Sequence, residues 1–102
     1  MRKNIILNKL KRGLKEIDPE IEIILFGSRA RGDFKRGSDW DVLLLTNKNF
    51  GYDIRQKMRD VIFEIELESE EPISTLIYSK EEWNDLEVTP LHQIIEAEGE
   101  KI

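Results

Sequence analysis

The sequence contains no cysteine in its 102 residues. This absence excludes disulfide bonds, thiolate zinc sites and thiol nucleophiles, and it leads us to expect a cytoplasmic protein, since a reducing compartment suits such a chain. Histidine is almost as scarce, because His92 is the only one. A lone histidine without companions is more often a surface residue than a catalytic one. We therefore expect His92 on the polar side of a helix, facing solvent.

Long hydrophobic runs are also missing. The basic residues at the N-terminus precede only three apolar residues, too few for the core of a signal peptide, and no later run approaches the length of a membrane span. We therefore expect a soluble protein without a membrane partner. A chain of this length suits one domain, which we place at residues 1–102. So small a domain leaves apolar surface that a second copy or a partner chain can cover.

The sequence also lacks a surplus of positive charge. The net charge of −5 argues against a general nucleic-acid binder, which needs many lysines and arginines to displace counterions. The charge is nevertheless uneven. Residues 1–36 hold ten Lys or Arg against five Asp or Glu, whereas residues 37–102 hold six against sixteen. The positive part surrounds a glycine-rich segment at residues 27–32, where a bound polyphosphate would need it.

Apolar periodicity and turn residues predict the order helix, strand, strand, helix, strand, helix, helix. The predicted elements cover residues 6–17, 21–26, 39–46, 54–65, 73–78, 79–83 and 89–98. The clearest helical face is that of the second helix, where Ile54, Met58, Val61, Ile62 and Ile65 recur at helical spacing. This order predicts a layered α/β domain.

Two capping patterns predict where the last two helices begin. Ser79 and Glu82 have the spacing of a capping box, which opens a short helix. A Thr-Pro pair at residues 89 and 90 supplies a cap with proline in the first turn of the last helix. We expect this helix to direct Leu91, Ile94 and Ile95 towards the core. The two tryptophans are expected to pack in the core rather than to stack on a base.

The segment from Gly27 to Gly32 has the pattern of a phosphate site. A strand that runs into Gly-Ser and then into a helix start leaves free backbone N–H groups that can hold phosphate oxygens. Gly27 lets the backbone come close, and the Ser28 hydroxyl can donate to the same phosphate. Four basic residues offer charge to a polyphosphate, among which the pattern does not choose: Arg29, Arg31, Lys35 and Arg36. A Walker-type site is rejected because its Gly-Lys-Ser/Thr is missing.

Asp39 and Asp41 are the candidate metal ligands. Side chains alternate along a strand, so these two carboxylates share one face while Trp40 points to the other. Two ionised carboxylates side by side repel each other unless a cation lies between them, and a divalent ion bound through oxygen is the usual solution. Mg²⁺ suits the pair best because it combines few carboxylates with phosphate oxygens and waters. Such ions support phosphoryl and nucleotidyl transfer.

These residues resemble the minimal nucleotidyltransferases of the DNA polymerase β-like superfamily found in prokaryotic toxin-antitoxin pairs. The pattern Gly-Ser-x-Ala-x-Gly, a spacer and then Ser-Asp-x-Asp-Val is carried by Gly27, Ser28, Ala30, Gly32, Ser38, Asp39, Asp41 and Val42. The resemblance, which extends more loosely over the whole chain, implies a small mixed β-sheet flanked by helices. It implies catalytic and metal roles for Asp39 and Asp41, with one or two Mg²⁺ ions, and binding of ATP or another nucleoside triphosphate by Gly27, Ser28, Arg31 and Ser38. It also implies a small helical HEPN partner protein, an RNase toxin.

Active members of this superfamily have a third carboxylate on a later strand, which completes the metal site. The strand at residues 73–78 is the natural place for it, and Ser74 occupies the corresponding position. A serine hydroxyl is not an anionic ligand at neutral pH. Either Glu70 or Glu71 therefore reaches in from the preceding turn, or the third position is vacant and these glutamates belong to a solvated acidic run.

Two functions follow as hypotheses. The first is an enzyme that transfers AMP from ATP and Mg²⁺ to a hydroxyl group of a partner protein, as the antitoxin of a HEPN pair. The second is a catalytically weakened module that binds a nucleotide or neutralises a toxin by contact, because Ser74 replaces the third carboxylate. Transfer to RNA or to a small molecule is less favoured, since so short a chain has no further domain to hold such a substrate.

Overall fold

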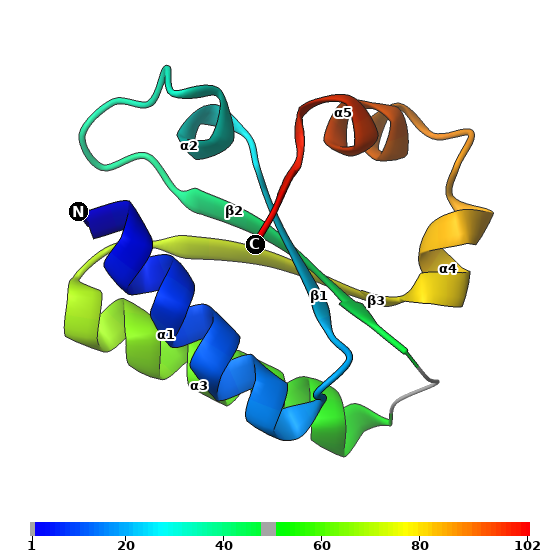
Figure 1. Ribbon diagram of the computed structural model, residues 1–102, viewed down its shortest axis with the longest axis horizontal. Coiled ribbons are helices and arrows are strands. Elements are labelled where there is room, and N and C mark those ends of the chain that lie inside the picture. Colours follow the sequence, from blue (N-terminus) through cyan, green and yellow to red (C-terminus); the bar gives the residue numbers. More distant parts are fainter. Residues whose placement is uncertain (1, 48–50) are drawn as a thin grey trace.

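The computed structural model describes residues 2–47 and 51–102, and Figure 1 shows them as a sheet with helices on both sides. The elements in chain order are α1 (Arg2–Ile17), β1 (Glu22–Phe26), α2 (Ser28–Arg31), β2 (Trp40–Thr46), α3 (Tyr52–Ser69), β3 (Ile73–Ser79), α4 (Lys80–Asp85), α5 (Pro90–Glu98) and β4 (Glu100–Lys101). The seven predicted helices and strands are present in the predicted order, and the structure adds α2, whose start the glycine-rich segment suggested, and β4. The sequence did not predict β4, because two residues are too few to show a periodic pattern.

The strands form one mixed sheet with the order β3-β2-β1-β4. β1 pairs antiparallel with both β2 and β4, whereas β2 and β3 are parallel and are joined through the crossover helix α3. The central pair β1 and β2 brings the end of β1 next to the beginning of β2. The predicted mixed sheet flanked by helices is therefore confirmed, and its two central strands juxtapose the two sequence motifs.

Side-chain alternation along β2 divides the core into two layers. Trp40, Val42 and Leu44 belong to the larger cluster, which packs against α1 and α3. Leu43 and Leu45 face the other way, into a smaller cluster that packs against α4 and α5. In Figure 1, α1 and α3 lie side by side on one side of the sheet and α4 and α5 lie on the other. Asp41 shares the side of Leu43 and Leu45.

The long helices α1 and α3 pack closely where α1 has a glycine. A Cβ atom added to Gly13 would lie 2.7 Å from the Val61 side chain, so the missing side chain lets the two helices approach. The expected inward face of α3 is confirmed: Met58, Ile62 and Ile65 are buried. Within the described ranges, no helix combines the length and apolar character that a membrane crossing requires.

The two predicted caps are present. In the capping box of α4, the Ser79 hydroxyl accepts the N–H of Glu82 at 3.0 Å and the Glu82 carboxylate accepts the N–H of Ser79 at 2.9 Å. Thr89 caps α5 by accepting the N–H of His92 at 3.3 Å.

The expectation that His92 faces solvent is wrong. Its ring stacks on Trp83 with centroids 4.4 Å apart, and the side chain is only 13% exposed.

The inward face expected for α5 is only partly correct. Ile95 is buried, but Leu91 is 40% exposed and Ile94 is 50% exposed. The physical reason is the small size of the second core cluster, in which a nine-residue helix touches the sheet along a single narrow stripe. Together with Val88, which is 80% exposed, these residues leave apolar surface on the outer side of α5.

Candidate active site

The glycine-rich segment forms a tight strand-turn-helix junction. β1 ends at Phe26, and Gly27 then has φ 73° and ψ −159°, a conformation open to glycine. The carbonyl of Gly27 accepts the N–H groups of Ala30 and Arg31, both at 3.1 Å, which starts the short helix α2. These bonds leave the N–H groups of residues 28 and 29 as the first amides of the turn, without a partner inside the helix.

Gly27 lies directly against the carboxylate of Asp41. Phe26 and Asp41 are paired across β1 and β2, so the turn begins beside the first residues of β2. A Cβ atom built on Gly27 would lie 2.3 Å from Oδ2 of Asp41. Any side chain at this position would therefore displace the carboxylate. Glycine is required here for two reasons, its conformation and the close approach.

Asp39 and Asp41 interact electrostatically at the beginning of β2. Asp41 is half-buried and Asp39, which precedes the strand, is exposed. Burial raises the pKa of Asp41, and the negative charge of Asp39 raises it further, while the nearby Arg31 acts in the opposite direction. The structure thus brings together the two predicted carboxylates and one predicted arginine.

Arg31 connects α2 with the end of α5. Its Nε donates to Asp33 at 3.1 Å and its Nη1 donates to Glu98 at 3.0 Å. The hydrogen bonds to Asp33 and then to Glu98 raise the pKa of Arg31. The guanidinium is exposed and close enough to lower the pKa of Asp41, so it remains accessible to an anion beside the carboxylate pair.

The predicted nucleotide-binding serines occupy different settings. Ser28 is the first residue of α2 and is half-buried. The Ser38 hydroxyl accepts the N–H of Lys35 at 3.0 Å, and the Ser38 carbonyl accepts a hydrogen bond from Arg29 at 3.2 Å. In this structure Ser38 therefore closes the loop between α2 and β2, immediately before Asp39.

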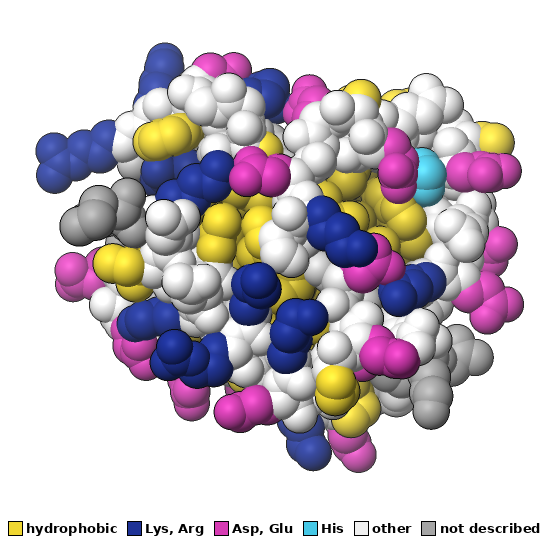
Figure 2. Space-filling model, viewed as in Figure 1, with side chains coloured by type: hydrophobic (Ala, Val, Ile, Leu, Met, Phe, Trp, Pro, Cys, Tyr) yellow, Lys and Arg dark blue, Asp and Glu magenta, His cyan; other side chains and the backbone are white. Residues whose placement is uncertain are grey.

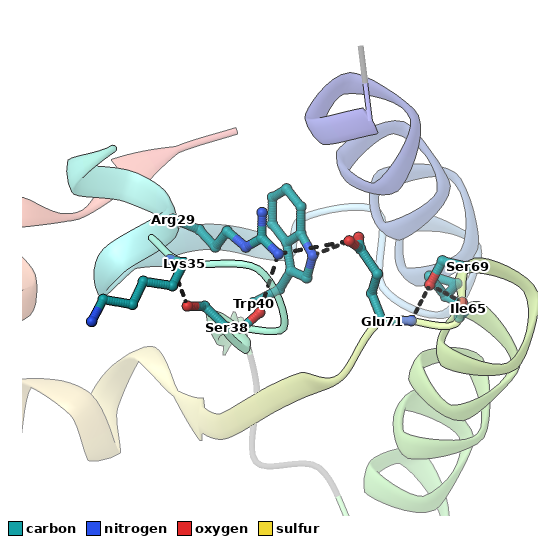
Figure 3. Close-up of polar contacts among 7 residues, drawn as sticks. All are labelled: Arg29, Lys35, Ser38, Trp40, Ile65, Ser69 and Glu71. Atoms are coloured by element: carbon teal, nitrogen blue, oxygen red, sulfur yellow. Dashed lines mark hydrogen bonds and ion pairs between the residues drawn. The ribbon is translucent and has the colours of Figure 1, made fainter. Parts of the chain in front are cut away.

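Arg29 has a role that the sequence did not distinguish from that of its basic neighbours. The residue is only 8% exposed, and its guanidinium lies over two aromatic rings, 4.2 Å from the centroid of Phe34 and 4.4 Å from that of Trp40. Figure 3 shows the guanidinium beside Trp40 and Glu71. A charge pattern does not reveal which arginine is buried, because that depends on a residue distant in sequence, Glu71.

Glu71 and Glu70 do not complete a three-carboxylate site. The Glu71 carboxylate accepts the indole N–H of Trp40 at 2.8 Å and forms an ion pair with Arg29 at 3.6 Å, on the side of β2 opposite to Asp41. Glu70 is exposed and ends α3 in a left-handed conformation, with φ 57°. Both expectations for Glu71 were therefore wrong, since it is neither a third ligand nor solvated.

Ser74 is next to Asp41 on the neighbouring strand. The register of the parallel pair β2 and β3 matches Asp41 with Ser74, so the two side chains leave the sheet on the same face. Ser74 is exposed. The strand register thus places a serine, and not a carboxylate, beside Asp41 on this face.

The donor set fits a magnesium ion with two protein ligands. In residues 2–47 and 51–102, no group of three or more His, Asp or Glu side chains is arranged to hold a metal ion. Mg²⁺ commonly uses one or two carboxylates and takes its other ligands from phosphates and water, so Asp39 and Asp41 suffice. The raised pKa of Asp41 beside Asp39 is the expected property of a pair that a cation would stabilise.

Charge is distributed around the site as the sequence indicated. Figure 2 shows Lys and Arg side chains gathered over α1 and around α2 with its following loop, whereas Asp and Glu predominate beside α4 and α5. Residues 79–99 contain six acidic residues and one lysine. A polyanion would therefore meet a favourable field on the α2 side of the site.

Comparisons with known proteins identify the family of the chain. A family model described as a nucleotidyltransferase domain matches residues 7–102. A Methanocaldococcus jannaschii protein that carries the provisional name protein adenylyltransferase is 35% identical over 77 residues, which cover 74% of this chain and 78% of the relative. A crystal structure described as a toxin-antitoxin with AMP-PNP shares the fold, with a TM-score of 0.67 at 21% identity, over 92% of this chain and 69% of that one. The resemblance seen in residues 27–42 is thus confirmed, and the chain belongs to the nucleotidyltransferase domain family.

Proposed function

We propose that this nucleotidyltransferase transfers AMP from ATP to a hydroxyl group of a partner protein, with Mg²⁺ bound by Asp39 and Asp41. The observation that carries the proposal is the contact between Gly27 and Asp41. The turn that begins at Gly27 lies against a carboxylate whose pKa is raised by burial and by the negative charge of Asp39. A triphosphate and its cation need these two elements side by side.

Each residue of the site has a part in this reaction. The amides that open α2 and the Ser28 hydroxyl bind phosphate oxygens, and Arg31 adds a positive charge that can exchange its carboxylate partners for phosphate. Asp39 and Asp41 would hold Mg²⁺, which would supply charge neutralisation for the phosphates when bound. Asp41 must be ionised for this purpose.

The transfer itself makes and breaks one bond at the α-phosphorus. The acceptor oxygen forms a bond to that phosphorus, the bond from the phosphorus to the bridging oxygen breaks, and pyrophosphate leaves with the electron pair. The hydroxyl proton passes to solvent, because Ser74 on β3 offers no carboxylate to accept it. Positioning of the substrates and neutralisation of the phosphate charge therefore account for most of the rate enhancement.

Two comparisons support a protein as the acceptor. The Methanocaldococcus jannaschii relative is named for protein adenylylation, and the structure that shares this fold is described as a toxin-antitoxin with an ATP analogue. By analogy, the acceptor here is a small helical partner of the HEPN type. The apolar surface left by Leu91 and Ile94 on α5 provides area for such a contact.

The experiment uses the protein, radiolabelled ATP, Mg²⁺ and the proposed partner, for which the products of the adjacent genes are the candidates. We expect label on the partner when the ATP carries it at the α-phosphate and none when it carries it at the γ-phosphate. The substitution Asp39→Asn should reduce the transfer by at least about 100-fold, as expected for the loss of a metal ligand. Label transfer that survives Asp39→Asn would refute the assigned site.

A second candidate function is favoured by one observation, the serine beside Asp41. In this alternative the domain binds its nucleotide or its partner and neutralises a toxin by contact, without turnover. The double substitution Asp39→Asn and Asp41→Asn separates the two functions. Growth rescue from the partner's toxicity would persist in the double variant if contact suffices, and it would disappear if AMP transfer is required.

A further inference from the structure

We propose that Arg29, Trp40 and Glu71 form a clamp behind β2 that positions Asp39 relative to the phosphate-binding turn. Arg29 acts here as a positioning residue and not as a ligand of the polyphosphate. The inference rests on the proposed function, since it concerns the geometry of the proposed metal site. It follows from the contacts that join α2, the loop before β2 and the turn before β3 (Figure 3).

The guanidinium of Arg29 is held on several sides. The guanidinium lies over the rings of Phe34 and Trp40, and Glu71 provides the opposite charge at 3.6 Å. A buried cation is stable only when it is paired and hydrogen-bonded, and the planar guanidinium stacks on aromatic rings as an ammonium group does not. Because Arg29 belongs to α2 and follows Gly27 by two residues, this packing also fixes the turn.

The clamp holds the backbone on both sides of Asp39. On one side, Nη2 of Arg29 donates to the Ser38 carbonyl at 3.2 Å. On the other side, the Trp40 N–H donates to the Pro72 carbonyl at 2.9 Å, while its indole N–H donates to Glu71. Asp39 therefore lies between two anchored residues, and its exposed side chain emerges on the face of Asp41.

Glu71 connects the clamp to α3. Its backbone N–H donates to the Ser69 hydroxyl at 3.3 Å, and that hydroxyl donates to the carbonyl of Ile65 at 2.7 Å. Ile65 is part of the main core. The position of Asp39 is thus tied to the rigid part of the molecule through side chains that lie behind the strand, which explains why an acidic residue outside the metal site is buried.

The burial of Arg29 separates this role from direct phosphate binding. An exposed arginine that bound the triphosphate would change the KM for ATP when it is removed. A clamp residue instead changes the arrangement of the carboxylates, and so the affinity for the metal ion alone and the kcat. Residues that orient metal ligands typically change metal affinity or activity by 10-fold to 100-fold when they are replaced.

The test measures Mn²⁺ binding to the isolated protein by electron paramagnetic resonance, together with amide hydrogen exchange in residues 33–40. For Arg29→Met we expect about 10-fold weaker Mn²⁺ binding and faster exchange in this loop. Arg29→Lys should not restore either property, because the ammonium group lacks the planar fork. The matched control is Arg59→Met, an exposed arginine of α3, which should leave both properties unchanged.

A milder variant covers the case in which Arg29→Met does not fold. Trp40→Phe keeps an aromatic ring over Arg29 and removes the N–H that binds Glu71 together with part of a buried ring. The same changes in Mn²⁺ binding and loop exchange should appear, but they should be smaller. Native Mn²⁺ affinity and native loop exchange in the folded variants would overturn the clamp. A raised KM for ATP with unchanged Mn²⁺ affinity would also overturn it, since that result describes a phosphate ligand.

The clamp and the proposed function can fail independently. Asp39→Asn should abolish Mn²⁺ binding without accelerating exchange in the loop, because it removes a ligand and leaves the clamp intact. If Asp39→Asn leaves Mn²⁺ binding unchanged, the proposed metal site is wrong. The loop exchange of Arg29→Met still decides the clamp in that case.

Discussion

Ser74 and Asp41 are direct neighbours on the parallel strands β2 and β3. A carboxylate at position 74 would therefore share the face of Asp41 and complete a three-carboxylate site. We expect Ser74→Asp to bind Mn²⁺ several-fold more tightly than the wild type and to increase the rate of AMP transfer. Without metal, three adjacent negative charges should lower the melting temperature.

The isosteric control is Ser74→Asn, which adds a similar side chain without charge. It should change neither the Mn²⁺ affinity nor the melting temperature in EDTA by a comparable amount. The measurement is a thermal melt with EDTA and with Mg²⁺ for both variants. A Ser74→Asp protein whose melting temperature does not respond to Mg²⁺ more than that of the wild type would contradict the assigned geometry.

The raised pKa of Asp41 predicts how stability depends on pH. Burial and the charge of Asp39 disfavour the ionised form in the folded protein, so the folded state binds a proton more readily than the unfolded state does. As the pH rises from the ordinary aspartate pKa through the raised pKa of the folded protein, Asp41 lowers the free energy of unfolding by an increasing amount. This destabilisation is complete at pH values above the raised pKa.

Asp41→Asn should consequently raise the melting temperature of the metal-free protein at pH 7. The advantage should shrink as the pH is lowered towards 3.8, where the unfolded carboxyl also becomes protonated. Melts of the wild type and the variant in EDTA at several pH values test this, with Asp85→Asn, at the exposed end of α4, as a control for an exposed carboxylate. If the difference in melting temperature between wild type and Asp41→Asn stays constant across this pH range, the titration of Asp41 is not the cause of the pH dependence.

Much of the fold could be predicted because local signals agree with one another. The spacing of Met58, Ile62 and Ile65 identified a helical face, and the capping box placed the start of α4. The glycine turn and the paired aspartates were visible for the same reason, since each needs only a few neighbouring residues. The two-residue strand β4 left no such pattern and was missed.

The partners of buried charges could not be predicted, because they come from distant parts of the chain. The sequence does not distinguish Arg29 from its three basic neighbours. Its ion-pair partner is Glu71, which lies 42 residues later in the sequence. The same acidic turn suggested a metal ligand at Glu71. The hydrogen bond from the Trp40 indole shows that this carboxylate is on the face of Trp40, and the register of β2 and β3 shows that Ser74 is beside Asp41.

Gly27→Ala should affect both stability and the site. The backbone conformation at Gly27 costs an alanine about 1–3 kcal/mol, and the new Cβ would lie 2.3 Å from the Asp41 carboxylate. We expect a lower free energy of unfolding in urea and the loss of Mn²⁺ binding. Gly32→Ala is the matched control, because Gly32 also has a positive φ, of 87°, but has open space around it. It should lose stability and keep Mn²⁺ binding.

Equal Mn²⁺ affinity in the two glycine variants would mean that the close approach of Gly27 to Asp41 has no part in the site. The comparison is informative because both substitutions introduce the same methyl group at a positive φ, one at each end of α2. Only at Gly27 does the new methyl group meet the carboxylate.

The two adjacent isoleucines of α5 should respond differently to truncation. Ile95 packs against Trp83, Leu43 and Leu45, so Ile95→Ala should lower the free energy of unfolding by about 2–4 kcal/mol. Ile94 is half exposed, and Ile94→Ala should change it by less than about 0.5 kcal/mol. Urea denaturation of both variants measures the difference. A similar loss for both residues would place Ile94 in the core, as the sequence pattern alone suggested, and would remove the exposed apolar face of α5 as a contact surface for a partner.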